Sequence, residues 1–111
     1  MPWRLRLAEP AEADLREAVA WSRQVFGEAQ AARYRLALRA TAMAVRQDPF
    51  GPLTRGQEAL LPGLRSLHMR EAGQRGRHVL YYRAEDAGRI LVLRVLHDAM
   101  DPTRHLPPGP R

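Results

Sequence analysis

The sequence contains no cysteine, no lysine and no long hydrophobic run. The lack of cysteine excludes disulfide scaffolds, thiolate metal sites and a cysteine nucleophile. No segment approaches the ~18–20 apolar residues that a membrane-spanning helix needs. The opening segment MPWRLRLAEPAEADL has no apolar stretch of the kind found in secretory signals. We therefore expect a cytoplasmic protein without membrane segments or disulfide bonds.

All 18 basic residues are arginine, and they outweigh the 12 acidic residues to give a formal net charge of +6. Such an excess favours an anionic partner, either a nucleic acid or an acidic protein surface. GC-rich coding is an alternative explanation for the missing lysine and carries no functional meaning. Under either explanation, the planar guanidinium group suits carboxylate and phosphate partners equally.

The length of 111 residues, with 45% hydrophobic and 27% charged residues, favours one ordinary globular domain. We expect this domain to span residues 1–106. The last five residues, PPGPR at 107–111, cannot build regular structure, and we expect them to form a flexible tail.

Hydrophobic periodicity predicts two helices and four strands. The first helix starts at Pro10 and ends before Gly27, and the second runs from Glu28 to Gln47. Strands are predicted at 3–7, 64–69, 78–83 and 89–96, with a proline- and glycine-rich loop at 49–63 and a turn at 85–88. This β-α-α-β-β-β order predicts an α+β fold, in which an N-terminal helical hairpin packs on one face of an antiparallel sheet.

The second helix has two apolar faces, one with Leu36 and Met43 and the other with Leu38 and Val45. Both faces must therefore be covered, and the first helix and the sheet could supply the covers. The predicted core consists of these residues or their neighbours: Leu15, Val19, Phe26, Leu36, Met43, Val92 and Leu96. The adjacent Tyr81 and Tyr82 should point to opposite sheet faces and serve packing.

Between the two apolar faces of this helix lie Arg35, Arg39 and Arg46. They form either a solvated edge or a basic contact stripe.

The chain has no Walker, G-x-S-x-G or H-E-x-x-H motif. His97, Asp101 and His105 have helical spacing, but Pro102 interrupts the helix, so we predict no metal site and no cofactor. Metal-free RNA cleavage would need an acid, a base and cations around the phosphate. His97 with Arg70 or Arg83 could supply these groups, although their spacing does not show that they converge.

Taken in order, several segments resemble the ParE branch of the RelE/ParE toxin superfamily of type II toxin–antitoxin systems. The segments are AEPAEADL at 8–15, GEAQAARY at 27–34, PFGPLTRG at 49–56, LPGLRSL at 61–67, HVLYYR at 78–83 and RVLHDAMDPTRHL at 94–106. The last is the most specific. The fold of this superfamily is the β-α-α-β-β-β arrangement predicted above.

The resemblance implies a growth-inhibiting toxin that blocks DNA gyrase without being an enzyme. It also implies a ParD-like antitoxin in a toxin–antitoxin hetero-oligomer, for which we predict contacts at Arg35, Arg39 and Arg46 or at the arginines near the sheet. The predicted target-binding residues are Arg94, His97, Asp101, Arg104 and His105.

RelE-type relatives instead cut messenger RNA on the ribosome, using basic residues with a tyrosine or histidine near the last strand. Here residues 97–101 contain two acids and no tyrosine, which favours the ParE interpretation. The RelE-type nuclease, with His97, Arg70 and Arg83 as catalytic residues, is the alternative. A chain that only binds its antitoxin is a third possibility.

Overall fold

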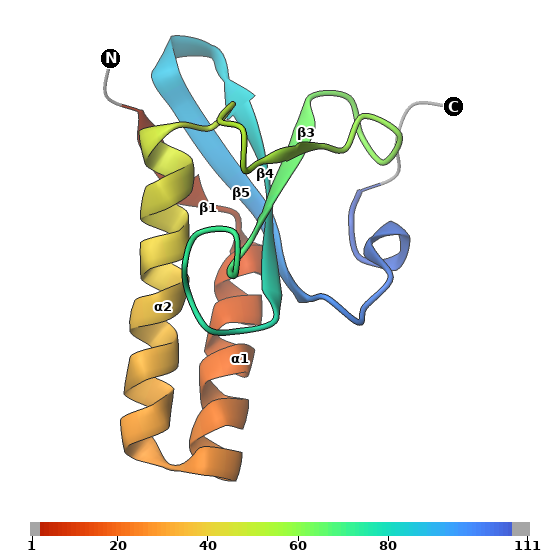
Figure 1. The fold of residues 1–111 in the computed structure, drawn as a ribbon. Helices are drawn as coiled ribbons and strands as arrows, with labels where there is room; N and C mark the ends of the chain where they lie inside the picture. The colour runs from red at the N-terminus through yellow and green to blue at the C-terminus, as the bar shows by residue number, and fades with distance from the viewer. Residues whose placement is uncertain (1–2, 108–111) are drawn as a thin grey trace.

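A helical hairpin stands on one face of a five-stranded sheet in the computed structural model, which describes residues 3–107 (Figure 1). The elements in chain order are β1 (Arg4–Leu7), α1 (Glu9–Phe26), α2 (Glu28–Gln47), β2 (Arg55–Gly56), β3 (Leu64–His68), β4 (His78–Glu85) and β5 (Arg89–His97), with 3₁₀ turns at Asp86–Gly88 and Pro102–Arg104. The predicted helices and main strands are confirmed to within about two residues, and the two-residue β2 is an addition. Of the predicted tail, residues 108–111 lie outside the described residues.

The two helices are separated by a single residue, Gly27, whose φ of 93° favours glycine. Its N–H donates to the carbonyl of Arg23 at 2.9 Å, and its own carbonyl accepts from Ala31 N–H at 3.1 Å. One glycine therefore ends α1 and starts α2, which gives the hairpin its tight joint. None of the helices within residues 3–107 is long and apolar enough to cross a membrane.

The sheet has the strand order β1-β5-β4-β3-β2, and β1 runs parallel to β5. The other strand pairs are antiparallel. The sheet is therefore mixed, and the prediction of a fully antiparallel sheet is wrong at this one pairing. The hairpin returns the chain to the end of the sheet where β1 begins, so β3 and β5 run in the direction of β1 (Figure 1).

The main core lies between the hairpin and the sheet, and α2 contributes Leu38 and Val45 to it. The prediction that Leu36 and Met43 lie in the core is wrong, because Leu36 is 64% exposed and Met43 is 44% exposed. Phe26 is also exposed, at 62%. The hairpin is the outermost layer on this side, so nothing among the described residues covers the second apolar face of α2. Among the other predicted core residues, Val92 is buried in this cluster, while Leu15 and Val19 are partly buried against it.

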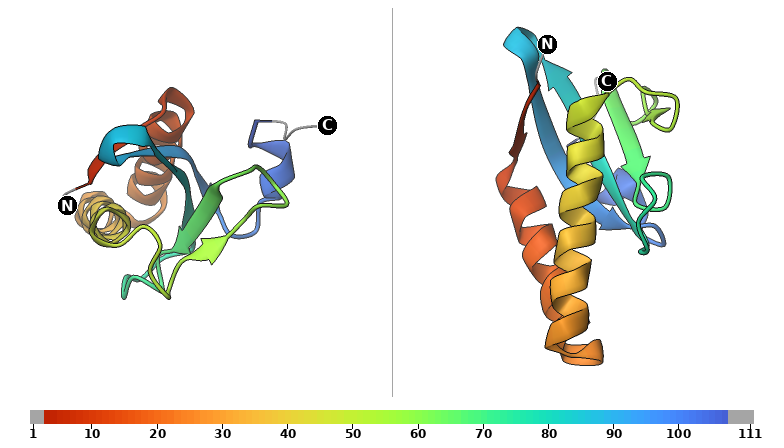
Figure 2. Two further views of the ribbon diagram at one scale, coloured as in Figure 1. Left: turned by 90° about the horizontal axis from the view of Figure 1, so that it is seen from above. Right: turned by 60° about the vertical axis from the view of Figure 1, so that its left-hand side comes forward.

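A second, smaller cluster fills the opposite face of the sheet and consists of Leu61, Leu64, Tyr81 and Leu96. Seen from above, the helices and the C-terminal 3₁₀ turn lie on opposite sides of the sheet (Figure 2). Tyr82 belongs to the main core and Tyr81 to the second cluster, which confirms the prediction that the two rings point to opposite faces.

Leu96 is buried, as predicted, but on the face away from the helices. In a regular strand Val92 and Leu96 would share a face, because side chains alternate with a period of two. A β-bulge intervenes: Tyr82 pairs with Val92 and Tyr81 pairs with Arg94, which leaves Leu93 as the extra residue. Beyond the bulge, Val95 faces the main core and Leu96 faces the second cluster.

Candidate functional site

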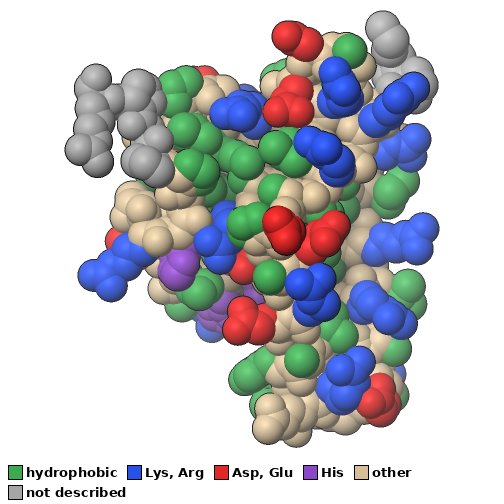
Figure 3. Space-filling view, turned by 180° about the vertical axis from the view of Figure 1, so that it is seen from behind, with side chains coloured by type: hydrophobic (Ala, Val, Ile, Leu, Met, Phe, Trp, Pro, Cys, Tyr) green, Lys and Arg blue, Asp and Glu red, His purple; other side chains and the backbone are tan. Residues whose placement is uncertain are grey.

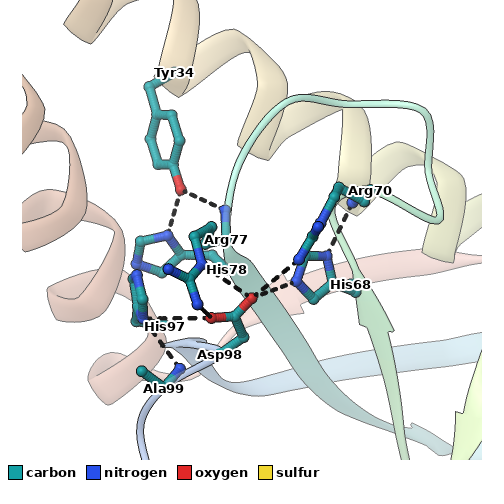
Figure 4. Close-up of polar contacts among 8 residues, drawn as sticks. All are labelled: Tyr34, His68, Arg70, Arg77, His78, His97, Asp98 and Ala99. Carbon is teal, nitrogen blue, oxygen red and sulfur yellow. Dashed lines mark hydrogen bonds and ion pairs between the residues drawn. The ribbon is translucent and has the colours of Figure 1, made fainter.

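The Asp98 carboxylate lies immediately after β5 at the centre of a cluster of basic groups (Figure 4). Its Oδ2 is 2.9 Å from His68 Nε2 and 3.5 Å from the Arg70 guanidinium, and its Oδ1 is 2.9 Å from the Arg77 guanidinium. His97 Nδ1 lies 3.6 Å from the same Oδ1. We call Asp98 and these four partners the Asp98 cluster.

The sheet topology explains why these residues meet. His68 ends β3, His78 starts β4 and His97 ends β5, and His78 pairs with His97 in the antiparallel register. Asp98 N–H then donates to the carbonyl of Arg77 at 2.7 Å, which prolongs the pairing by one residue. The cluster therefore gathers side chains from one end of three neighbouring strands.

The cluster is organised around a fully ionised carboxylate. Hydrogen bonds from His68 and then Arg77 hold the pKa of Asp98 at about 2, below its usual range. His68 Nδ1 accepts a hydrogen bond from the backbone N–H of Arg70 at 3.0 Å. The proton of the neutral ring is therefore on Nε2, which donates its hydrogen bond to Asp98. His97 Nδ1 similarly accepts the N–H of Ala99 at 3.1 Å. Both imidazoles are therefore fixed in one tautomer by neighbouring backbone.

Next to the cluster, Tyr34 of α2 hydrogen-bonds to His78 Nδ1 and links the hairpin to the start of β4 (Figure 4). Burial, followed by the charge of His97, lowers the pKa of His78 to about 4. His78 is consequently neutral at neutral pH and serves as a packed polar link. The sequence assigned no role to Tyr34, and Arg77 was one of several arginines near the strands with nothing to set it apart from the others.

The three residues considered for RNA cleavage are only partly brought together. His97 and Arg70 both contact Asp98. Arg83 lies five positions along β4 from His78, the residue that pairs with His97, which is roughly 16 Å of strand. It lies 3.8 Å from Glu85 instead. The predicted catalytic trio is therefore not assembled in this structure.

Among the predicted target-binding residues, Arg94 points into the fold. Its Nε and Nη2 donate to the two carboxylate oxygens of Asp14 on α1 at 2.7 and 2.8 Å, and its Nη1 donates to the carbonyl of His105 at 2.7 Å. Asp14 also accepts the backbone N–H of Val95 at 2.9 Å, just past the β-bulge. These contacts give Arg94 a structural role in joining α1, β5 and the C-terminal segment.

The other predicted target-binding residues are divided between the C-terminal 3₁₀ turn and the Asp98 cluster. Asp101 accepts the N–H and the hydroxyl of Thr103 at 3.0 and 2.8 Å and so caps the 3₁₀ turn. These hydrogen bonds lower the pKa of Asp101. Arg104 is exposed, His105 is half-buried, and His97 remains with the Asp98 cluster. Within residues 3–107, no group of three His, Cys, Asp or Glu side chains is placed to hold a metal ion.

A groove of about 580 Å³ is lined by residues of α1 and α2 together with residues of β1, β4 and β5. Its floor is apolar, and four arginines line it. The lining residues are Leu5, Leu7, Leu15, Arg16, Val19, Ala20, Arg23, Arg35, Leu38, Arg39, Ala42, Leu80 and Val95. We call it the hairpin groove. Viewed from behind, basic side chains are spread along the helical side of the molecule, with hydrophobic side chains exposed among them (Figure 3).

Two of the three arginines predicted to bind the antitoxin, Arg35 and Arg39, line the hairpin groove. The third, Arg46, donates from Nε to the carbonyl of Trp3 at 2.8 Å and ties α2 to the segment before β1. Arg35 and Arg39 therefore lie beside an apolar surface, whose residues could not be identified from the sequence.

Three comparisons with known proteins agree with this geometry. Residues 5–102 match the family described as the ParE toxin of the type II toxin–antitoxin system parDE. The chain is 35% identical to Toxin ParE1 of Caulobacter vibrioides over 101 residues, which cover 91% of this chain and 95% of that protein.

Two solved structures share the fold. One is described as the chromosomal ParDE toxin–antitoxin system from P. aeruginosa, with a TM-score of 0.70 and 20% identity, covering 86% of this chain and 95% of that chain. The other is the toxin–antitoxin complex RelBE2 from Mycobacterium tuberculosis, with a TM-score of 0.61 and 22% identity, covering 87% and 99%. The family match and the ParE1 identity together show that this chain belongs to the ParE toxin family of type II toxin–antitoxin systems.

Proposed function

We propose that this ParE-type toxin inhibits DNA gyrase by binding it in the cytoplasm, and that a ParD-like antitoxin neutralises the toxin in a hetero-oligomer. The observation that carries the choice of target is the position of Asp98. A carboxylate occupies the point on which His68, Arg70 and Arg77 converge. A phosphodiester would meet a negative charge at that point, whereas catalysis of RNA cleavage needs uncompensated positive charge there.

The RelE-type alternative lacks two further features. Arg83 lies far along β4 from His97 and is adjacent to Glu85. The Tyr34 hydroxyl, next to the Asp98 cluster, is engaged with His78 in the hairpin–sheet contact. Protein binding requires neither group to be free, so both observations support inhibition through a protein surface.

The hairpin groove supports the antitoxin part of the proposal. An amphipathic helix could place its apolar face on the groove floor and its acidic side chains against Arg16, Arg23, Arg35 and Arg39. The two solved relatives of this fold are described as toxin–antitoxin systems or complexes. A toxin with a net charge of +6 should also attract an acidic segment over a distance and accelerate its association.

Primer extension on translated messenger, with wild-type toxin and with His97→Ala, tests the choice of target. We expect intact messenger with both proteins, and toxicity in cells that is changed little by His97→Ala. A nuclease that used His97 as an acid or base would lose about 10²–10⁴ in rate on this substitution. Cuts at A-site codons that disappear with His97→Ala would contradict the proposal.

A further inference from the structure

A hollow of about 300 Å³, separate from the hairpin groove, lies where the hairpin meets the end of the sheet. Its lining comes from the second half of α1, the first half of α2, the turn before β4, and the adjacent ends of β4 and β5. We call it the aromatic pocket. It shares no lining residue with the hairpin groove. A ligand held here would therefore contact other residues than those that we assign to the antitoxin.

One wall of the aromatic pocket is formed by two imidazole rings. His78 and His97 pair across β4 and β5, and their ring centroids are 5.6 Å apart (Figure 4). Because His97 Nδ1 accepts the N–H of Ala99, the proton of its neutral ring is on Nε2. The Tyr34 oxygen accepts the N–H of Arg77 at 3.4 Å and gives its own proton to His78 Nδ1. The proton of His78 is therefore on Nε2 as well.

These two N–H groups are not used by the protein. Neither Nε2 atom forms a hydrogen bond within residues 3–107, and neither is sealed from solvent. Ser22 of α1 adds a third donor. It is 3% exposed, its hydroxyl has no hydrogen-bond partner among the described residues, and its oxygen is not sealed, so it opens into the pocket. Because buried polar side chains usually have a partner, these three groups together indicate a site for a hydrogen-bond acceptor.

The charges around the pocket select the kind of acceptor. Among the described residues that form the lining, none is an aspartate or a glutamate. The only guanidinium group there, that of Arg77, lies 2.9 Å from Asp98 and is balanced by it. Neutral donors without an uncompensated cation suit a singly charged acceptor. A carboxylate meets this condition, whereas a doubly charged phosphate would lose more hydration than these donors replace.

The other wall of the aromatic pocket is apolar. Trp21 and Phe26 of α1 meet edge to face, with their ring centroids 5.7 Å apart. They are 59% and 62% exposed, although tryptophan is on average a highly buried residue. Ala18 and the ring of Tyr34 continue this surface into the pocket. A ligand that fits both walls carries a flat apolar group next to its carboxylate.

We propose that the aromatic pocket binds a small carboxylic acid in its ionised form, with the carboxylate on Ser22, His78 and His97 and an apolar ring against Trp21 and Phe26. Such a ligand connects α1 with the ends of β4 and β5, so it stabilises the folded toxin by mass action. This is a binding function that goes beyond the inhibition of gyrase and does not depend on it. The pocket performs no chemistry.

A titration with 3-phenylpropanoate, followed by the amide and indole N–H chemical shifts, tests the proposal. We expect the indole signal of Trp21 to shift and that of Trp3 to stay, because Trp3 packs on Phe50 and does not line the pocket. The neutral 3-phenylpropanamide should bind at least tenfold more weakly, and so should acetate, which lacks the ring. Equal binding of the acid and its amide, or equal shifts of both indole signals, would overturn the proposal.

Two pairs of variants test the position of the carboxylate. Ser22→Ala should weaken binding of 3-phenylpropanoate roughly three- to tenfold, the effect of losing one hydrogen bond. Ser66→Ala removes an equally buried serine that does not line the pocket and should bind like the wild type. His97→Ala should also weaken binding, and His97→Gln, which restores an N–H donor, should recover part of it. If Ser22→Ala fails to fold, the two His97 variants decide. Equal affinities within each pair would contradict the proposal.

A last arm identifies the source of the acid. N-acetylphenylalanine presents the same carboxylate and ring as the last residue of a polypeptide. Binding at least as tight as that of 3-phenylpropanoate would assign the site to the C-terminal residue of a peptide, and weaker binding would assign it to a free acid. Both results retain the carboxylate site, whereas the absence of binding by both acids would overturn it.

Discussion

Asp14 and Arg94, 80 residues apart in the chain, form a two-pronged ion pair that fastens α1 to β5. The Asp14 side chain is 9% exposed and that of Arg94 is 21% exposed, so the pair is largely shielded from water. The same carboxylate satisfies the N–H of Val95 beside the β-bulge. The Asp14 carboxylate therefore holds α1 against the bulged part of β5.

Removing one partner of this pair should destabilise the fold strongly. We expect Arg94→Ala to lower the free energy of unfolding by about 2–5 kcal/mol, because Asp14 is left shielded without its cation. The control is Arg23→Ala, which breaks the exposed pair with Glu28 and should lower it by less than about 1 kcal/mol. Urea unfolding of the three proteins provides the measurement. Equal losses in the two variants would contradict the structural role of Arg94.

A matched pair of leucines on α2 tests which face of the helix is in the core. Leu38 is 2% exposed and Leu36 is 64% exposed. Leu38→Ala should lower the free energy of unfolding by about 2–5 kcal/mol, and Leu36→Ala should change it by no more than about 0.5 kcal/mol. Thermal or urea denaturation measures both. The reverse order of the two losses would show that the helix is rotated.

The element order and boundaries could be read from the sequence because each depends on local patterns. Gly27 separates the helices, and alternating side chains mark β4, with Tyr81 and Tyr82 on opposite faces. The apolar face of α2 could not be chosen, because both faces carry apolar side chains and only the tertiary arrangement decides which one is covered. The prediction that Leu96 faces the helices was wrong for a related reason. A β-bulge at Leu93 reverses the alternation of side chains along β5, and nothing in the sequence marks this bulge.

The candidate site could be predicted from the sequence less well than the fold. His97 and Arg70 could be singled out by residue type, and they do meet. That they meet on Asp98 depends on the ends of three strands lying side by side, which spacing along the chain does not reveal. Arg94 looked like a surface residue by its place near the C-terminus, yet its partner Asp14 lies on the first helix. Contacts between residues so distant in sequence require the folded structure.

Stability should fall as the pH is lowered from about 6.5 towards 4 because of His78. Its pKa is about 4 in the folded protein and about 6.5 in an unfolded chain. Over this interval the unfolded state binds more protons, which favours unfolding. The pKa of Asp98, about 2, affects stability only at lower pH, where protonation removes its favourable ionised form as the pH falls below about 3.8.

Urea unfolding at pH 7 and pH 5 measures this effect. Wild-type protein should lose more stability between the two values than His78→Gln does. The comparison variant is His105→Gln, which removes a histidine outside the Tyr34–His78 contact and should keep the wild-type dependence. If His78→Gln loses as much stability as the wild type, His78 is not the group responsible.

Charge reversal in the hairpin groove should impair capture of the antitoxin. We expect Arg39→Glu to slow association roughly three- to tenfold at low salt, because it replaces attraction with repulsion for an acidic segment. Arg33→Glu makes the same change in charge outside the groove lining and should have a clearly smaller effect. Stopped-flow association at two salt concentrations measures both rates. Equal slowing by the two variants would place the antitoxin elsewhere on the helices.

A gyrase supercoiling assay tests the central claim most directly. Purified toxin is added to gyrase and relaxed plasmid, alone or after incubation with the proposed ParD-like antitoxin. The account predicts that the toxin alone blocks supercoiling or traps cleaved DNA, and that the antitoxin restores activity once it matches the toxin in amount. Unchanged supercoiling in the presence of excess folded toxin would contradict it.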